Sequence, residues 1–222
     1  MARPKKVAVV VGQEPSFILI TDRYHCKLTF VNEALGSQPG RNDPASNFIR
    51  DRAREEHPEL NIPPEEVESL PTEISKGTTC FYRGSTGNAA FKSYQILGML
   101  RAAATCLNGI GDVNNLRSKI SNAVRITPVT IDTGILSEKL TILERPLRAQ
   151  TAQGPRVTLA RSECLPAGTE IKFDLDVIQL PKFAFPEALL RAILDYAQSM
   201  SGIGQWVNSG IYGKFIYELT RR

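Results

Sequence analysis

The sequence lacks any long uninterrupted run of apolar residues, although 42% of its 222 residues are hydrophobic. Near its start, one arginine and two lysines precede "VAVVV", a run of only five apolar residues. A membrane-spanning helix needs about 20 apolar residues, and a secretory signal needs a core of about 7 to 15. We therefore expect a soluble, cytoplasmic protein with no membrane partner. Its hydrophobic content suffices to bury a core in a single domain spanning residues 1–222.

Histidine is scarce, and the four cysteines lie far apart at positions 26, 80, 106 and 164. No CxxC pair occurs, and only His25 and His57 are present to complete a metal site. Structural zinc sites combine closely spaced cysteines and histidines. We therefore expect free, buried thiols, no metal ion and no cofactor.

The motifs of several common enzyme classes are also missing from the sequence. It contains no GxSxG, HExxH, GxxxxGK[ST] or DxDxDG pattern, which are typical of hydrolases, metalloproteases, nucleotide-binding loops and calcium sites. General acid/base catalysis usually relies on histidine or a carboxylate, but His25 lies in "DRYHCK" and His57 in the acidic "EEHPEL". We expect a protein that is not an enzyme, with no catalytic residue.

What the sequence does contain is an uneven distribution of charge around a net value of only +4. Residues 43–73 carry nine acids against three arginines, whereas residues 145–161 carry four arginines and no acid. The wider region 117–161 holds eight cations against three acids. An acidic run is typical of a solvated surface, and a basic surface of this kind fits a partner with repeated phosphates.

The hydrophobic patterns predict an α+β protein. Residues 16–35 are rich in strand patterns, and residues 36–78 are rich in proline, glycine and acids, which indicates an acidic insertion. A helix is expected from an N-cap at Asn88 to a stop at Asn108-Gly109, followed by a strand at 122–129.

The second half of the chain repeats this strand and helix order. "TEIKFDLDVI", residues 169–178, alternates apolar and charged residues and predicts an antiparallel strand with one wet face. A helix is expected at 186–200 and a last strand at 213–219. The order predicts a modified ferredoxin-like, RRM-like βαββαβ core, with a second, basic hairpin insertion at 129–168. Its two helices would cover one face of the sheet and leave the other face open to a ligand.

The basic insertion reads "ERPLRAQTAQGPRVTLARSECLPAGT", residues 144–169. "AQGP" predicts the turn of a hairpin whose arms carry the four arginines. Arginine offers a planar fork that suits phosphate oxygens, and neutral amides and hydroxyls can add contacts that fix no base sequence. An ordinary basic hairpin on the surface is the alternative interpretation.

The segment "GIGQWVNSGIYGKF", residues 202–215, contains four glycines, the only tryptophan and one lysine. Glycines of positive φ can bring backbone N–H groups together around an anion, while Trp206 and Tyr212 offer stacking faces for bases. The alternative is a purely structural connection between the last helix and the last strand, with Trp206 in the core.

The position of "GIGQWVNSGIYGKF" between the last helix and the last strand resembles the glycine-rich loop of the RAMP superfamily. These are repeat-associated RNA-binding proteins, which form CRISPR effector backbones and processing nucleases. The basic insertion is similar to the thumb-like hairpins of the backbone subunits. Together, "ERPLRAQTAQGPRVTLARSE" and the glycine-rich segment also resemble a family of uncharacterised bacteriophage and mobile-element proteins, over roughly residues 78–219.

The resemblance to RAMP backbone proteins implies non-catalytic binding of single-stranded nucleic acid, with RNA ahead of DNA, by a homo-oligomer or multi-subunit complex along the strand. If the protein is encoded by a phage, as the second resemblance implies, it would act in the cytoplasm of the host. The resemblance to the processing nucleases implies an alternative function, metal-independent RNA cleavage. Those nucleases often use a histidine, which here could be only His25 or His57. A third alternative is an interaction protein, such as a defence-complex inhibitor, which uses the acidic segment 43–73.

The expected nucleic-acid contacts are Lys92, Arg117, Lys119, Arg125, Arg145, Arg148, Gln150, Arg156, Arg161, Gly202, Gly204, Trp206, Gly210, Tyr212, Gly213 and Lys214.

Overall fold

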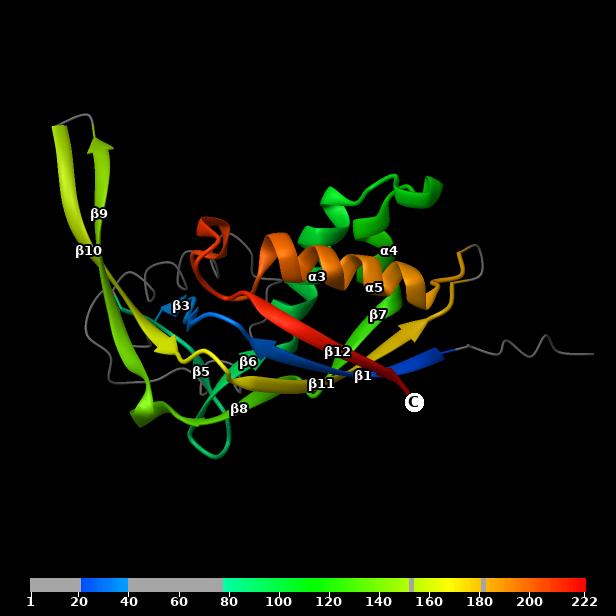
Figure 1. The fold of residues 1–222 in the computed structure, drawn as a ribbon, viewed down its shortest axis with the longest axis horizontal. Helices are drawn as coiled ribbons and strands as arrows, with labels where there is room; N and C mark the ends of the chain where they lie inside the picture. The colour runs from blue at the N-terminus through cyan, green and yellow to red at the C-terminus, as the bar shows by residue number, and fades with distance from the viewer. Residues whose placement is uncertain (1–20, 40–77, 152–153, 181–182) are drawn as a thin grey trace, which may run out of the picture.

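A four-stranded antiparallel sheet lies at the centre of the computed structural model, which describes residues 21–39, 78–151, 154–180 and 183–222 (Figure 1). Its strand order is β12-β1-β11-β7. The strands are β1 (Thr21–Phe30), β7 (Val124–Thr127), β11 (Glu170–Ile178) and β12 (Phe215–Arg221). Helices and antiparallel sheets together confirm the predicted α+β class.

Two helices, α3 (Ser93–Cys106) and α5 (Glu187–Tyr196), pack on the same face of this sheet (Figure 1). A short helix, α4 (Leu116–Ala123), follows α3, and a π-helical turn, η3 (Ala197–Ser201), extends α5. Single 3-10 turns occur at η1 (Ile110–Asp112), η2 (Ser137–Lys139) and η4 (Val207–Ser209).

The core forms where the alternating apolar side chains of the sheet meet the apolar faces of the helices. On β11, Ile171, Phe173, Leu175 and Val177 are all buried, as the alternation in the sequence predicts. Burial of each such side chain contributes about 1.5–3 kcal/mol relative to leaving it exposed. The opposite face of the sheet, which carries the polar residues, has no helix over it among the described elements.

Two further sheets flank this centre. One has the order β5-β6-β8, with β5 (Tyr82–Arg83), β6 (Asn88–Lys92) and β8 (Thr130–Leu136). The other combines β2 (Ala34–Leu35), β3 (Gln38–Pro39), β4 (Thr78–Cys80), β9 (Thr141–Thr151) and β10 (Gly154–Leu165). Figure 1 shows the β9–β10 hairpin extending away from the body of the molecule. Its antiparallel pairing runs from Thr141↔Cys164 to Thr151↔Gly154, so the chain reverses within "AQGP", as the sequence predicts.

The structure corrects the predicted start of the first helix. Asn88 does not cap a helix but begins strand β6, and the helix begins five residues later, at Ser93. Ala89, Ala90 and Phe91 are buried as they pair along β5 and β8, so tertiary packing overrides the helical periodicity there. Similarly, residues 130–136 of the expected hairpin insertion pair with β6 instead of projecting from the body.

Candidate nucleic-acid interface

The glycine-rich segment packs closely against neighbouring backbone at its two ends. A Cβ added to Gly213 would lie 2.1 Å from the carbonyl oxygen of Ile203, and one added to Gly204 would lie 2.6 Å from that of Leu35. Both glycines also have positive φ, at 68° and 107°. Only glycine tolerates this combination of close backbone approach and left-handed conformation. The segment therefore needs these glycines so that its two ends can pack against each other and its first part against β2.

Three of the four glycine N–H groups of the segment are not available to form the predicted anion cradle, because they donate to carbonyls of the protein. The N–H of Gly202 donates to the carbonyl of Ala197 at 3.0 Å, and the N–H of Gly213 donates to that of Glu33 at 2.8 Å. These donors are already satisfied within the protein, so they cannot also hold a phosphate. The N–H of Gly210 is also used, since it donates to the carbonyl of Val207 at 3.1 Å, although this glycine lies at the exposed end of the loop with no heavy atom within 4 Å of an added Cβ.

The glycine-rich loop and the basic hairpin meet at one arginine. The guanidinium carbon of Arg145, on β9, lies over the rings of Trp206 and Tyr212, at 5.6 Å and 5.4 Å from their centroids. Cation–π attraction at these distances holds the guanidinium in place. Its Nη1 is buried and has no acceptor among the described residues. We call Arg145, Trp206 and Tyr212 the arginine–aromatic junction.

A small polar cluster fixes the loop against the base of the hairpin. The side-chain oxygen of Gln205 accepts hydrogen bonds from the hydroxyls of Thr79 (2.7 Å) and Ser162 (2.8 Å). The backbone N–H of Gln205 donates to the carbonyl of Leu35 at 3.0 Å. Because Gln205 directly precedes Trp206, these bonds position the tryptophan ring beside β9.

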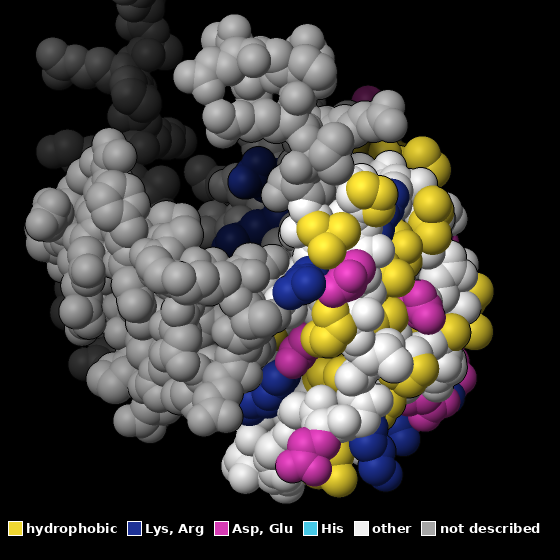
Figure 2. All heavy atoms as spheres, turned by 90° about the vertical axis from the view of Figure 1, so that its left-hand side faces the viewer, with side chains coloured by type: hydrophobic (Ala, Val, Ile, Leu, Met, Phe, Trp, Pro, Cys, Tyr) yellow, Lys and Arg dark blue, Asp and Glu magenta, His cyan; other side chains and the backbone are white. Residues whose placement is uncertain are grey.

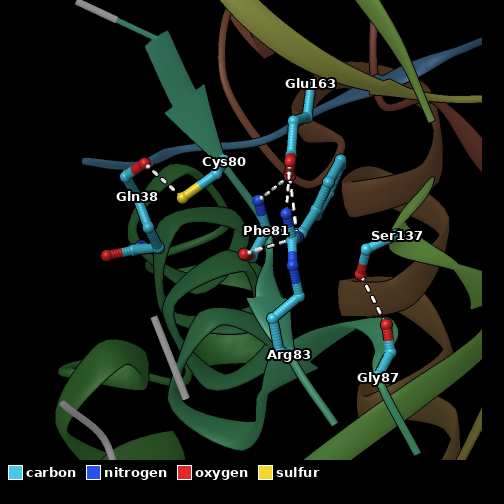
Figure 3. A network of polar contacts seen from close by, with 7 residues as sticks. All are labelled: Gln38, Cys80, Phe81, Arg83, Gly87, Ser137 and Glu163. Atoms are coloured by element: carbon cyan, nitrogen blue, oxygen red, sulfur yellow. Dashed lines mark hydrogen bonds and ion pairs between the residues drawn. The ribbon is translucent and has the colours of Figure 1, made fainter. Parts of the chain in front are cut away.

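A buried ion pair anchors the hairpin on its other side (Figure 3). Glu163, which is 5% exposed, accepts two hydrogen bonds from the guanidinium of Arg83 and a third from the N–H of Phe81, at 2.9 Å. Bidentate arginine–carboxylate pairs fix orientation as well as distance. The base of β10 is therefore held rigidly to β4 and β5, and Arg145 is held with it through the β9 pairing.

Other predicted contacts on the hairpin differ in their surroundings. Arg161 forms an ion pair with Glu144 directly across the ribbon, with Nε and Oε1 2.7 Å apart. This carboxylate neutralises much of the charge that the arginine would offer to a phosphate. Arg148 and Gln150 lie on β9 and Arg156 on β10, but their side chains lie outside the described residues.

Lys92 is the predicted contact that the structure does not support. It is only 6% exposed, and its ammonium donates to the hydroxyl of Thr130 at 3.0 Å and lies over the ring of Tyr82. Its backbone N–H also donates to Gln95, within the capping box of α3. Lys92 therefore holds the start of the helix to β8 inside the protein.

Three further cations lie away from the junction. Arg117 and Lys119 belong to α4, and Arg125 to β7, at the far edge of the central sheet. Figure 1 shows α4 toward the end of the molecule opposite the hairpin. The structure therefore does not bring these cations together with Arg145. Lys214 belongs to the glycine-rich segment itself, directly before β12, and its ammonium donates to the carbonyl of Ser199.

The uncovered face of the central sheet is neutralised by its own ion pairs. Arg23 pairs with Asp176 at 3.3 Å, and Lys27 with Glu218 at 2.6 Å. His25 lies 2.7 Å from Asp174, which also accepts a bond from Arg222. Seen from the hairpin end, the Lys and Arg side chains are likewise interspersed with acidic and hydrophobic ones (Figure 2). Neither of these two faces therefore presents a continuous basic track among its described residues.

The described residues contain no group of three or more His, Cys, Asp or Glu side chains placed to hold a metal ion. Among the same residues, no helix is both long and apolar enough to cross a membrane.

The residues that position the junction carry no motif that identifies them in the sequence. Thr79, Ser162 and Gln205 come from three distant segments, as do Arg83 and Glu163. The signal for Glu163 is the acid in "SECL", next to Cys164 and Leu165, because a carboxylate in a buried strand needs a partner. Nothing in the sequence pairs Arg145 with the two aromatic rings.

No family model matches the sequence, and no curated protein does. The fold is similar to that of a chain in a cryo-EM structure of the type III-B Cmr-beta bound to cognate target RNA, with a TM-score of 0.46 and 11% sequence identity. The match covers 90% of this chain and 60% of the other, so this chain spans less than two thirds of the length of that neighbour.

Proposed function

We propose that the protein binds single-stranded nucleic acid, RNA ahead of DNA, at the arginine–aromatic junction, without catalysing a reaction. The observation that carries this proposal is Arg145, whose guanidinium lies over two aromatic rings while its buried Nη1 has no acceptor among the described residues. A buried donor without an acceptor costs about 1–3 kcal/mol. A phosphate oxygen of the ligand would supply that acceptor and relieve the cost.

The same junction offers stacking surfaces. Trp206 and Tyr212 are half-buried, so each ring keeps part of its surface in contact with solvent. Stacking of a base on an aromatic ring contributes about 1–3 kcal/mol and depends little on which base it is. An arginine for the backbone and two rings for the bases are the two components that single-strand binding requires.

Within this proposal, the central sheet with α3 and α5 is a ferredoxin-like core of RAMP type. Its support is topological: α3 lies between β1 and β7 in the sequence, α5 lies between β11 and β12, and the sheet order is β12-β1-β11-β7. The described part of the uncovered sheet face is ion-paired, so we place the ligand at the loop and hairpin and not across the sheet.

The test uses Trp206, the only tryptophan in the sequence, whose fluorescence reports directly on the junction. Titration with a short oligouridylate is expected to change the fluorescence, and the affinity should fall between about 50 and 200 mM salt. Arg145→Ala should weaken binding about tenfold or more, and Arg145→Lys should not restore it, because lysine lacks the planar fork. Arg125→Ala, at the far edge of the sheet, serves as the charge-matched control.

Two outcomes would overturn this function. One is an absence of oligonucleotide binding at low salt. The other is an equal loss of affinity in Arg145→Ala and Arg125→Ala, which would show only a general charge effect. A parallel titration with oligodeoxythymidylate decides between RNA and DNA.

We further propose that the protein acts as a scaffold of phage type, with several copies along one strand. The hairpin that extends from the body is the element able to reach a neighbouring copy (Figure 1). Sedimentation of the protein with oligonucleotides of increasing length should show a stepwise increase in mass. One copy per strand at every length would contradict the scaffold.

Metal-independent RNA cleavage is a second candidate, and one observation favours it. Nδ1 of His25 lies 2.7 Å from the carboxylate of Asp174, a pairing that can orient an imidazole for general base catalysis. Wild-type protein incubated with RNA in a chelator would then cleave it, and His25→Ala would not. Intact RNA with both proteins would rule this activity out. His57 and the acidic segment 43–73 of the interaction-protein alternative lie outside the described residues.

A further inference from the structure

The amide of Gln205 lies where the glycine-rich loop meets the base of the hairpin. Its Oε1 accepts hydrogen bonds from the hydroxyls of Thr79 and Ser162, at 2.7 Å and 2.8 Å. Ser162 is buried and Thr79 half-buried, so this end of the amide faces the protein. An amide oxygen has two lone pairs, and both are therefore used.

The other end of the same amide is open. Nε2 of Gln205 has no acceptor among the described residues, and solvent can reach it because the side chain is only half-buried. This end offers two N–H donors and no acceptor. A ligand that meets it must therefore present a hydrogen-bond acceptor.

Gln205 and Arg145 reach the same face of the hairpin. The register places Ser162 diagonally opposite Arg145 on one face of the ribbon, and such neighbours lie about 7–8 Å apart, within reach of long side chains. Gln205 is bonded to Ser162, and Trp206, which follows it, lies against the guanidinium of Arg145. A nucleotide whose phosphate meets the buried Nη1 of Arg145 therefore has its base near the amide.

The backbone also fixes the ring that follows this amide. Trp206 has a φ of 60°, in the left-handed region that bulky residues rarely adopt. Its carbonyl accepts from the hydroxyl of Ser209 at 2.6 Å and from the N–H of the same residue at 3.0 Å. The stacking surface and the open donor are thus held next to each other by the fold.

The four bases differ in what they present to such a donor. A glutamine amide commonly recognises adenine with both ends, because Oε1 accepts from the N6 amino group while Nε2 donates to N7. At Gln205 the first of these bonds is excluded, since Thr79 and Ser162 occupy Oε1. The remaining donor matches the carbonyl O4 of uracil or O6 of guanine. In cytosine and adenine it would face an amino group, which is itself a donor.

We propose that Gln205 makes the arginine–aromatic junction selective for bases with a carbonyl group at this edge, uracil and guanine, over cytosine and adenine. This selectivity rests on the proposed function, because it specifies the ligand of the same junction. Stacking on Trp206 and Tyr212 depends little on which base is bound. The preference therefore comes from the amide and not from the rings.

The test compares a short oligouridylate with an oligocytidylate of the same length, through the fluorescence of Trp206. The two pyrimidines have the same size but present a carbonyl or an amino group at C4. The wild type should bind oligouridylate about fivefold more tightly, the effect of about one hydrogen bond between neutral groups. Arg145→Ala should weaken both ligands and leave their ratio unchanged.

Gln205→Glu gives the sharpest outcome. Its carboxylate still accepts from Thr79 and Ser162, but its second oxygen replaces the open donor by an acceptor. The added charge should weaken both oligonucleotides, and the ratio should reverse in favour of oligocytidylate, whose amino group can donate. Gln205→Met removes donor and acceptor while keeping the length of the side chain, and should bring the ratio to about one. Each ratio is measured within one variant, so it does not depend on the fraction of that variant that is folded.

Three results would overturn the selectivity. They are equal binding of the two oligonucleotides by the wild type, tighter binding of oligocytidylate by the wild type, and an unchanged ratio in Gln205→Glu. The second would mean that the amide is turned, with its oxygen toward the ligand. All three leave the proposed function standing, since oligouridylate would still bind through Arg145. Absence of binding to either oligonucleotide would instead overturn the proposed function and the selectivity together.

Discussion

Individual residues of this protein act through partners that are distant in the sequence. Arg145 is held by two rings from the glycine-rich loop, and Glu163 by Arg83 and the N–H of Phe81. Three thiols, those of Cys26, Cys80 and Cys164, are buried as expected, whereas Cys106 is exposed. The buried ion pair and the packed glycines are the residue-scale features with the largest expected effect on stability.

Glu163→Gln should lower the free energy of unfolding by about 3 kcal/mol. The substitution removes the charge that pairs with Arg83, and breaking a buried pair leaves its partner uncompensated. Urea denaturation measures the loss. Glu144→Gln is the matched control, because its ion pair with Arg161 is largely exposed and should contribute less than about 1 kcal/mol. Equal losses in the two variants would contradict the anchoring role of Glu163.

Gly213→Ala should be far more destabilising than Gly210→Ala, although both glycines have positive φ. At Gly213, the added Cβ would overlap the carbonyl of Ile203, so the loop must shift. At Gly210 nothing lies near, and only the left-handed conformation costs about 1–2 kcal/mol. Thermal unfolding of both variants compares the two costs, and similar melting temperatures would show that the loop does not pack as described.

At the scale of elements, the β9–β10 hairpin is divided into an anchored base and a projecting ribbon. Hydrogen bonds of Ser162 and Glu163 hold the base of β10 to the body of the protein. Farther out, β9 and β10 pair with each other. A two-stranded ribbon alone is marginally stable in water. The ribbon is therefore expected to contribute to binding more than to folding.

Replacing residues 145–160 by an Asn-Gly turn between Glu144 and Arg161 should leave the fold intact. These two residues are paired in the register, so a two-residue turn can join them. Circular dichroism should be unchanged apart from the lost strands, and stability should change by about 1 kcal/mol or less. Oligonucleotide binding should be lost with Arg145. A truncated protein that still binds oligouridylate would place the ligand elsewhere.

At the scale of the molecule, the arginine–aromatic junction lies at the hairpin, apart from the uncovered face of the central sheet (Figure 1). That face carries self-neutralising ion pairs. Buried thiols that must stay uncharged lie in the central sheet, at Cys26, and in the sheet of the hairpin, at Cys80 and Cys164.

The stability of the whole molecule should fall as the pH rises above about 9. Burial raises the pKa of Cys26 and Cys80 to about 12 and that of Cys164 to about 11, and the pKa of Tyr217 is also raised to about 12. The unfolded chain loses these protons first, so alkali favours unfolding by up to about 1.4 kcal/mol per group for each pH unit above the unfolded pKa. This stability is fully present below pH 9 and is lost toward pH 12. Urea midpoints that stay constant between pH 8.5 and 11.5 would contradict it.

Much of the secondary structure was predictable, because it depends on local patterns. The alternation of β11, the helix after Pro186 that ends before Gly202 and the turn at "AQGP" each follow from neighbouring residues. The predicted helix start at Asn88 was wrong because β6 is stabilised by pairing with β5 and β8, and this pairing forms only in the folded protein.

The composition and order of the segments determined by themselves that this is an α+β protein with a basic hairpin and a glycine-rich connection. The tertiary structure alone decided which cations matter. It buried Lys92, paired Arg161 with Glu144, placed Arg117 on α4 away from the hairpin and held Arg145 over Trp206 and Tyr212. The physical reason is that propensity and alternation act between neighbours along the chain, whereas burial and pairing of a charge depend on residues that meet only after folding.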